Sequence, residues 1–246
     1  MTPPFIEPDW PAPPTVGALS TTRAGGVSAE PFHSFNLGNH VGDDPGAVAI
    51  NRARLLNSLP PGTAIQWLEQ VHGTGVIRAT RSGNCPAADA SFSREPGIAC
   101  AVMTADCLPV LLCDRAGTVV AAAHSGWRGL LKGVLEATVE AMGIAPVELM
   151  AWLGPAIGPG AFEVGPEVEA AFTHHAADAA RLFQPSPNRK GHLMADIYGL
   201  ARQRLCATGV TGVYGGFRCT FSEVDHFFSY RRDGQCGRMA SLVYLR

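Results

Sequence analysis

The chain has 246 residues, a formal net charge of −2 and 46% hydrophobic residues, which is enough for a sizeable core and excludes a disordered chain. Without a Lys/Arg cluster, non-specific nucleic-acid binding is not expected. No run approaches the ~18 apolar residues of a membrane span, and the N-terminus lacks the features of a signal peptide. Seven cysteines without framework spacing suit a reducing compartment. We therefore expect a cytoplasmic protein that binds neither nucleic acid nor membrane.

No linker or low-complexity tract divides the chain, so we expect one domain over residues 1–246. An extended lead-in precedes a helix at 46–56, which Asp44 caps and Pro45 opens. Strands and helices then mix without a βαβ rhythm, which favours an α+β fold. In chain order, the pattern predicts strands at 66–68, 75–80 and 98–103, a helix at 130–142, a strand at 148–153, helices from 166 and at 195–207, and strands at 210–214 and 241–245.

The most informative local pattern is a hairpin between two apolar runs, which flank Asp-Arg-Ala-Gly at 114–117. With Arg115 and Ala116 at its tip, Cys107 lies directly opposite His124, at a Cβ separation of about 4.5–5.5 Å. A three-residue turn with a glycine bulge shifts this register by one. A thiolate and an imidazole at such a separation can bind one zinc ion together.

His72 is the best third ligand, because it lies between two apolar stretches and next to a flexible glycine. One cysteine and two histidines leave a fourth position open, as in catalytic zinc sites. The spacing of the three residues matches no compact zinc-finger rule. Taken alone, this spacing favours the alternative that Cys107 is a buried thiol acting as a small hydrophobic residue and that the histidines bind nothing.

Eight motifs occur in order along the chain, and together they are specific although each alone is weak. They are STTRAGGVS at 20–28, FNLGNHVGDD at 35–44, QVHG at 70–73, TADC at 104–107, HSGWRG at 124–129, GPAIGP at 154–159, FSYRRD at 228–233 and GRMA at 237–240. Over nearly its whole length the chain thus resembles the YfiH family, also called the laccase-domain or polyphenol oxidase family. Ser125 replaces the alanine of the family's Ala-Gly-Trp-Arg-Gly block.

The resemblance implies a four-layer α/β/β/α arrangement with two mixed β-sheets packed face to face. In the family a histidine, a cysteine and a second histidine bind zinc, and they map onto His72, Cys107 and His124. It also implies a purine nucleoside phosphorylase that converts adenosine or inosine and phosphate to the free base and ribose 1-phosphate. Some members also deaminate adenosine or cleave methylthioadenosine. We therefore expect zinc, purine nucleosides and phosphate as ligands, and a monomer or weak homodimer.

Two residues are candidates for catalysis. Asp106, next to Cys107, is expected to hydrogen-bond a metal ligand or to move protons, with capping of local backbone as the alternative. Arg23, in a glycine-rich loop, can hold phosphate or a ribose oxygen through its planar fork, unless it is a solvated loop arginine.

Further candidates concern substrate binding. Arg128 follows Gly126 near a helix N-terminus, where free amides attract anions, or it stacks on Trp127 instead. Asn36, together with His40, belongs to a polar loop that can line the pocket.

Two other functions use the same residues. Cys107 paired with His124 could be the nucleophile of a hydrolase or amidase, such as one that edits peptidoglycan precursors. This alternative conflicts with zinc binding, because a thiolate bound to zinc is not free to attack.

Multicopper oxidation needs many histidine ligands, often as His-x-His pairs, but the chain has eight histidines and no such pair. Copper can still displace zinc in vitro, because it binds N/S ligands more tightly, and phenol oxidation is then a side activity.

The remaining polar segments are expected to be structural. His174 and His175 are assigned to the surface, and residues 231–234 to a hairpin turn. Of the other cysteines, we expect 100, 113 and 206 in the core and 219 and 236 as thiols without a disulfide.

Overall fold

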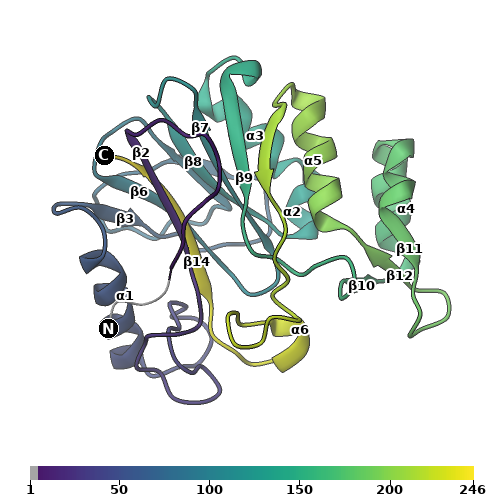
Figure 1. Cartoon of the computed structure of the whole chain (residues 1–246), viewed down its shortest axis with the longest axis horizontal. Coiled ribbons are helices and arrows are strands. Elements are labelled where there is room, and N and C mark those ends of the chain that lie inside the picture. The colour runs from purple at the N-terminus through teal and green to yellow at the C-terminus, as the bar shows by residue number, and fades with distance from the viewer. Residues whose placement is uncertain (1–4) are drawn as a thin grey trace.

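The computed structural model describes residues 5–246 (Figure 1). Residues 1–4 of the expected extended lead-in lie outside the described residues. The strands are β1 (Phe5–Ile6), β2 (Val16–Thr21), β3 (Ala64–Gln66), β4 (Val76–Arg78), β5 (Ala90–Ser93), β6 (Ile98–Thr104), β7 (Leu108–Asp114), β8 (Val120–Ser125), β9 (Leu149–Leu153), β10 (Glu163–Val164), β11 (Phe183–Pro185), β12 (Leu193–Ala195), β13 (Gly212–Gly215) and β14 (Met239–Leu245). The helices are α1 (Pro45–Asn57), α2 (Trp127–Lys132), α3 (Val134–Met142), α4 (Pro166–His175), α5 (Ile197–Thr208) and α6 (Tyr230–Asp233), with short 3₁₀ turns at Pro146–Glu148 and Ala177–Leu182.

Local signals explain where several helices begin and end. The side chain of Asp44 accepts hydrogen bonds from the amides of Gly46 and Ala47 and so caps α1, as the sequence predicts. The single helix expected at 130–142 is wrong: α2 and α3 are separate helices, because Gly133 adopts a left-handed φ of 101° between them. The expected turn at 231–234 is also wrong in part, since Ser229 caps the short helix α6 there.

Two large mixed sheets form the centre of the molecule. One has the strand order β1-β2-β14-β6-β3 and the other β13-β9-β7-β8-β5-β4, while β10, β12 and β11 make a small third sheet. Figure 1 shows this small sheet beside α4 at one end of the molecule. The mixture of parallel and antiparallel pairs within each large sheet agrees with the expected α+β class.

The two large sheets pack face to face and are covered by helices on their outer faces. Along β8, Val120 and Ala122 pack into the core between the sheets, whereas Ala121 and Ala123 pack toward α3 and α5. On the other side, α1 contributes Leu55 to a core with β6 and β14. The expected four-layer α/β/β/α arrangement is therefore confirmed.

The register of the central hairpin differs from the prediction. Pro109, not Cys107, lies opposite His124, and Cys107 precedes the first residue of β7. The reason is a longer loop: the carboxylate of Asp114 accepts hydrogen bonds from the amides of Thr118 and Val119 at 2.6 and 2.9 Å. This side-chain cap closes four residues, 115–118, between the strands and moves the pairing by two positions.

The cysteines lie at different depths in the molecule. Cys100 and Cys113 are buried as expected, whereas Cys206 is exposed on α5, so its assignment to the core was wrong. All seven thiols are free. Within residues 5–246, no helix is both long and apolar enough to cross a bilayer.

Candidate metal centre and its cavity

Three side chains that can bind a metal meet at one end of the six-stranded sheet. His72 lies in the loop before β4, Cys107 just before β7, and His124 near the end of β8. One ligand atom from each lies within 4.8 Å of those of the other two. Sγ of Cys107 is 3.9 Å from Nε2 of His72, and the two imidazole rings meet edge to face with centroids 4.8 Å apart. Although the predicted register is wrong, the structure brings the three predicted ligands together.

The backbone is left-handed at two positions around this cluster. Within residues 5–246, His72 and Asp106 are the non-glycine residues with positive φ, at 57° and 93°. This region is rare for ordinary side chains, although histidine and aspartate enter it more readily than most. Such conformations persist where the surrounding structure fixes them, and they concentrate at functional sites. Here His72 is itself a candidate ligand, and Asp106 lies directly before another candidate ligand, Cys107.

Asp89, directly before β5, connects the candidate ligands beneath the cluster. Its Oδ1 lies 2.8 Å from Nδ1 of His124 and accepts the amide of His72 at 2.9 Å. Its Oδ2 accepts the amide of Gly73 at 2.6 Å. With Nδ1 facing the carboxylate, Nε2 of His124 is the ring nitrogen available to a metal. One buried carboxylate therefore orients one histidine ring and fixes the loop that carries the other.

The charges at the cluster are coupled. Burial raises the pKa of Cys107, but His124 and then His72 outweigh it and lower the pKa to about 6. Burial lowers the pKa of His124, while the Cys107 thiolate and the Asp89 carboxylate raise it to about 9. Burial also raises the pKa of Asp89, but its hydrogen bonds with His124 and Gly73 hold that pKa below the usual value. Without a metal, this environment favours a thiolate beside an imidazolium.

Gly126 lets the cluster form at close range. A Cβ atom at this position would lie 2.9 Å from Sγ of Cys107 and 3.2 Å from Cδ2 of His72. Gly126 is also the residue before α2, with φ −58°, so it is required for space and not for its backbone conformation. The Ser-Gly-Trp sequence after His124 thus leaves room for the other two candidate ligands.

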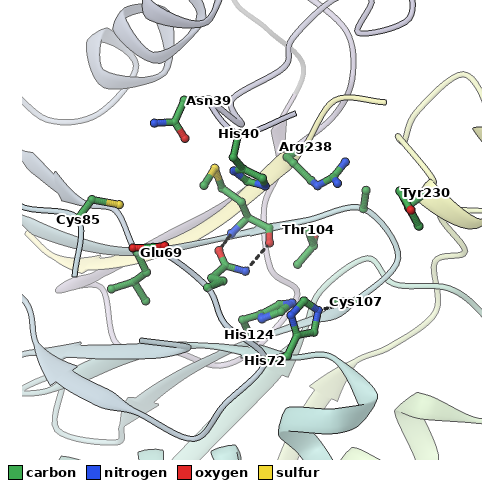
Figure 2. A pocket seen from close by; sticks show the side chains of 14 residues that line it. Asn39, His40, Glu69, His72, Cys85, Thr104, Cys107, His124, Tyr230 and Arg238 are labelled. Atoms are coloured by element: carbon green, nitrogen blue, oxygen red, sulfur yellow. Dashed lines mark hydrogen bonds between the residues drawn. The ribbon is translucent and has the colours of Figure 1, made fainter. Parts of the chain in front are cut away.

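The cluster lies in the wall of a cavity of about 780 Å³ (Figure 2). The side chain of Gln70 pairs with both backbone groups of Met103: it accepts the amide at 2.7 Å and donates to the carbonyl at 2.8 Å. This pairing ties the loop that carries His72 to β6 of the other large sheet. The cavity is lined by Asn39, His40, Leu68, Glu69, Gln70, His72, Cys85, Met103, Thr104, Ala105, Cys107, His124, Tyr230 and Arg238.

Asp106 has structural partners in this geometry. Its carboxylate accepts a hydrogen bond from the Thr220 hydroxyl at 2.6 Å and from the Arg231 amide at 2.7 Å, and its carbonyl accepts the amide of Ile157 at 2.9 Å. The contact expected between Asp106 and a metal ligand is made by Asp89 instead. Asp106 holds three distant segments around the backbone that leads into Cys107.

Three predicted substrate-binding residues lie outside the lining of this cavity. Arg23 lines a second cavity of about 510 Å³, and its guanidinium donates to the carbonyls of His33 and Val224, both at 3.1 Å. The guanidinium of Arg128 lies 4.5 Å from the centre of the Trp127 ring, which is the stacking alternative.

Asn36 supports the cavity from behind. It is fully buried, its Oδ1 accepts the amide of Arg238 at 2.9 Å, and its Nδ2 donates to Asp43 at 2.8 Å. His40, expected beside it, does line the cavity.

The sequence reasoning missed Asp89 and gave no cavity role to Arg238. Asp89 stands in the sequence Ala-Ala-Asp-Ala before β5, and a single acid inside a small apolar run is a signal for a buried partner. Arg238 belongs to the quoted motif at 237–240, but its place beside His40 depends on contacts between distant segments.

Comparison with known proteins assigns the family. Residues 17–246 match the family described as multi-copper polyphenol oxidoreductase laccase. The chain belongs to this laccase-domain family, which includes YfiH. It is 58% identical to a purine nucleoside phosphorylase of Pseudomonas aeruginosa and 54% identical to the purine nucleoside phosphorylase YfiH of Escherichia coli K12, in each case over 98% of both chains.

Solved structures of similar proteins share the fold. A Neisseria meningitidis protein superposes with a TM-score of 0.94 at 54% identity, over 98% of each chain. YlmD from Geobacillus stearothermophilus superposes with a TM-score of 0.88 at 32% identity, over 98% of this chain and 96% of that one. The expected family resemblance is thus confirmed.

Proposed function

We propose that the chain is a zinc-dependent purine nucleoside phosphorylase that acts on adenosine and inosine, and on methylthioadenosine as a further substrate. The observation that carries this proposal is the cluster of His72, Cys107 and His124 in the wall of a cavity of about 780 Å³. This volume lies in the range of small-molecule sites, about 300–1,000 Å³. The names of the relatives at 58% and 54% identity support the choice of reaction.

The donor set fits zinc. A thiolate and two imidazoles are ligands that zinc prefers, and a three-residue set leaves one position for a substrate or water, as in catalytic sites. Donors around one tetrahedral zinc ion lie about 3.3–3.8 Å apart, given bond lengths of about 2.0–2.3 Å. The donors here lie within 4.8 Å of one another, so a small side-chain movement suffices. When bound, the ion would supply Lewis-acid stabilisation of negative charge in the cavity.

Phosphorolysis needs two substrates held in line. An oxygen of phosphate forms a bond to C1′ of the ribose, and the bond from C1′ to the purine nitrogen breaks. The electron pair of the broken bond goes to the purine, which takes up a proton, and ribose 1-phosphate is the second product. The protein contributes chiefly by orienting phosphate and nucleoside and by excluding water. In this proposal Asn36 and Asp106 fix the backbone around the cavity. Arg23 and Arg128 do not line the cavity, so neither is assigned a contact with the substrates there.

The test is an assay of the zinc-loaded protein with adenosine or inosine, with and without phosphate, and identification of the products by mass. Release of adenine or hypoxanthine that depends on phosphate supports the proposal, since phosphate is the attacking group. Cleavage at the same rate without phosphate contradicts it and indicates a hydrolase. The same assay detects deamination, in which adenosine and water give inosine and ammonia, as the second activity that the family resemblance implies.

A cysteine hydrolase or amidase is the second candidate, and one observation favours it. Sγ of Cys107 lies 3.9 Å from Nε2 of His72. The pKa of the Cys107 thiol is lowered to about 6, which is typical of nucleophilic cysteines. Alkylation separates the two functions. A thiolate bound to zinc is protected from iodoacetamide, whereas a free nucleophile reacts quickly in protein that is fully active.

Copper-dependent phenol oxidation fits the geometry less well. Residues 5–246 contain one group of three or more side chains placed to hold a metal, whereas multicopper oxidation needs several coppers. We therefore treat phenol oxidation as a side activity of copper bound in the zinc position.

A further inference from the structure

Arg238 presents a cation to the cavity without an acidic partner. Its Nη1 donates to the carbonyls of Cys236 and Gly237, at 2.9 and 3.0 Å, and lies 3.6 Å from Sγ of Cys236. None of the ion pairs among residues 5–246 involves Arg238. Its Nε and Nη2 groups donate no hydrogen bond within the same residues. An arginine in a cavity wall with two unused donor groups is suited to an anionic ligand.

The position of Arg238 is fixed before any ligand arrives. Its amide donates to the buried side chain of Asn36 at 2.9 Å. A Cβ atom at Gly38 would lie 2.8 Å from Cγ of Arg238, so the loop packs directly on the arginine stem. The guanidinium also lies 5.8 Å from the centre of the Tyr230 ring. Such preorganisation lowers the entropy lost when the guanidinium binds a ligand.

Two more basic groups lie near Arg238: His40, which lines the cavity, and Arg52, which does not but acts electrostatically on His40. Figure 2 shows His40 next to Arg238, on the side of the cavity opposite His72, Cys107 and His124. Burial lowers the pKa of His40, and the charges of Arg238 and Arg52 lower it further, so both arginines act on this ring. Arg52 likewise takes part in no ion pair among residues 5–246.

The one carboxylate that lines the cavity does not neutralise this group. Glu69 lies beside Cys85 in Figure 2 and contributes to the charge environment of that thiol. Arg52 is held elsewhere: its Nε donates to the carbonyl of Leu37 at 2.9 Å, and its guanidinium lies 4.2 Å from the centre of the Trp67 ring. Among residues 5–246, no ion pair balances the charge of Arg238 or of Arg52.

We propose that Arg238, with His40 beside it and Arg52 behind it, is the subsite for inorganic phosphate. A guanidinium matches the oxygens of phosphate with two parallel hydrogen bonds, and the imidazole of His40 can donate a further hydrogen bond from another direction. The assignment of the anion as a reacting phosphate rests on the proposed function. The cluster and this subsite line the same cavity of about 780 Å³.

Direct binding tests the subsite without turnover. Titration of inorganic phosphate into the zinc-loaded protein is followed by calorimetry for the wild type, Arg238→Gln and Arg238→Lys. We expect Arg238→Gln to weaken phosphate binding at least about tenfold, because charged hydrogen bonds are lost. Arg238→Lys should be intermediate, because a point charge remains without the fork. Arg189→Gln is the matched control, since it removes the same charge at an exposed position between β11 and β12.

Kinetics and stability complete the experiment. In Arg238→Gln the KM for phosphate should rise at least about tenfold, while zinc content and the KM for inosine stay within about twofold. Thermal melting checks the fold, and if Arg238→Gln does not fold, Arg238→Lys and His40→Asn carry the test. Unchanged phosphate binding in a folded Arg238 variant overturns the subsite. If adenosine 5′-monophosphate binds through Arg238 and inorganic phosphate does not, the site is for a phosphate ester and the proposal is wrong.

Failure of the subsite and failure of the proposed function give different results. If the wild type releases base only with phosphate, but Arg238 variants keep the wild-type phosphate KM, the function stands and the subsite does not. If phosphate binds through Arg238 but no nucleoside is cleaved, the binding site stands and its assignment to a reacting phosphate is wrong.

Discussion

Nδ1 of His124 lies 2.8 Å from Oδ1 of Asp89, between side chains that are 3% and 0% exposed. The same carboxylate accepts the amides of His72 and Gly73 from a loop that is distant in the sequence. A single buried acid therefore fixes one candidate ligand through its ring and another through its backbone.

Replacing Asp89 by asparagine should weaken zinc binding about 10–100-fold, the usual effect of removing a carboxylate that orients a ligating histidine. An amide has one acceptor oxygen, so it cannot accept both the backbone amides and the His124 N–H. Competition with a chromogenic chelator measures the zinc affinity. Asp178→Asn, at an exposed position in the 3₁₀ turn after α4, is the control and should bind zinc like the wild type. Equal affinities of Asp89→Asn and wild type would show that the contact does not support the metal.

Gly126→Ala should reduce zinc affinity at least about tenfold while the protein stays folded. The added methyl group meets Sγ of Cys107 at 2.9 Å, so the thiolate must move away from the histidines. The backbone of Gly126 has φ −58°, which alanine adopts without strain. Gly160→Ala is a matched control, because a Cβ there meets nothing within 4 Å. The two variants are compared by zinc titration and thermal melting, and similar zinc affinities would contradict the steric argument.

Zinc content tests the ligand set itself. Protein prepared without chelators should carry about one zinc ion per chain, and His72→Ala, Cys107→Ser and His124→Ala should each lose it, because two ligands hold zinc poorly. Metal analysis by mass spectrometry reports the stoichiometry. A His72→Ala variant that keeps both zinc and activity would exclude His72 as a ligand. Several copper ions per chain in the wild type would contradict the zinc assignment altogether.

The hairpin cap at Asp114 should make stability depend on pH. Burial raises the pKa of Asp114, but hydrogen bonds from Val119 and Thr118 outweigh it and keep the pKa below its usual value. The carboxylate therefore stabilises the fold above the unfolded pKa of about 3.9, and this contribution disappears as the pH falls. In Asp114→Asn we expect a free energy of unfolding about 1–3 kcal/mol lower at pH 7, and a smaller difference near pH 3. Denaturant unfolding at several pH values measures this, and a constant difference would refute the explanation.

The sequence predicted the elements better than their pairing. The apolar runs before and after Asp114 are β7 and β8, since strand propensity and turn composition are local properties. Their register was wrong by two positions, because it depends on which backbone amides the Asp114 side chain caps. The break at Gly133 was missed for a related reason: the apolar spacing of a helix continues across it, while the left-handed glycine ends one helix and begins another.

The candidate site was predictable as a set of ligands, but its support was not. His72 and Cys107 were identified from residue type and family resemblance, and the structure places them together with His124. Asp89 and Arg238 were not predicted for the site, because the local sequence around each of them does not show which distant residues it contacts. Each acts through contacts between segments that only the packed sheets bring together.

The candidate ligands lie far apart in the sequence, since His72 and Cys107 alone are 35 positions apart. In an unfolded chain, one ion can be held by all three only at the entropic cost of closing long loops, so an ion bound at this cluster favours the native state. Binding that is confined to one state raises its stability by mass action, by about 2.7 kcal/mol when free ligand reaches a hundred times its dissociation constant. With zinc bound at this cluster as proposed, free zinc should raise the melting temperature of this protein, and its resistance to proteolysis should rise with the metal supply.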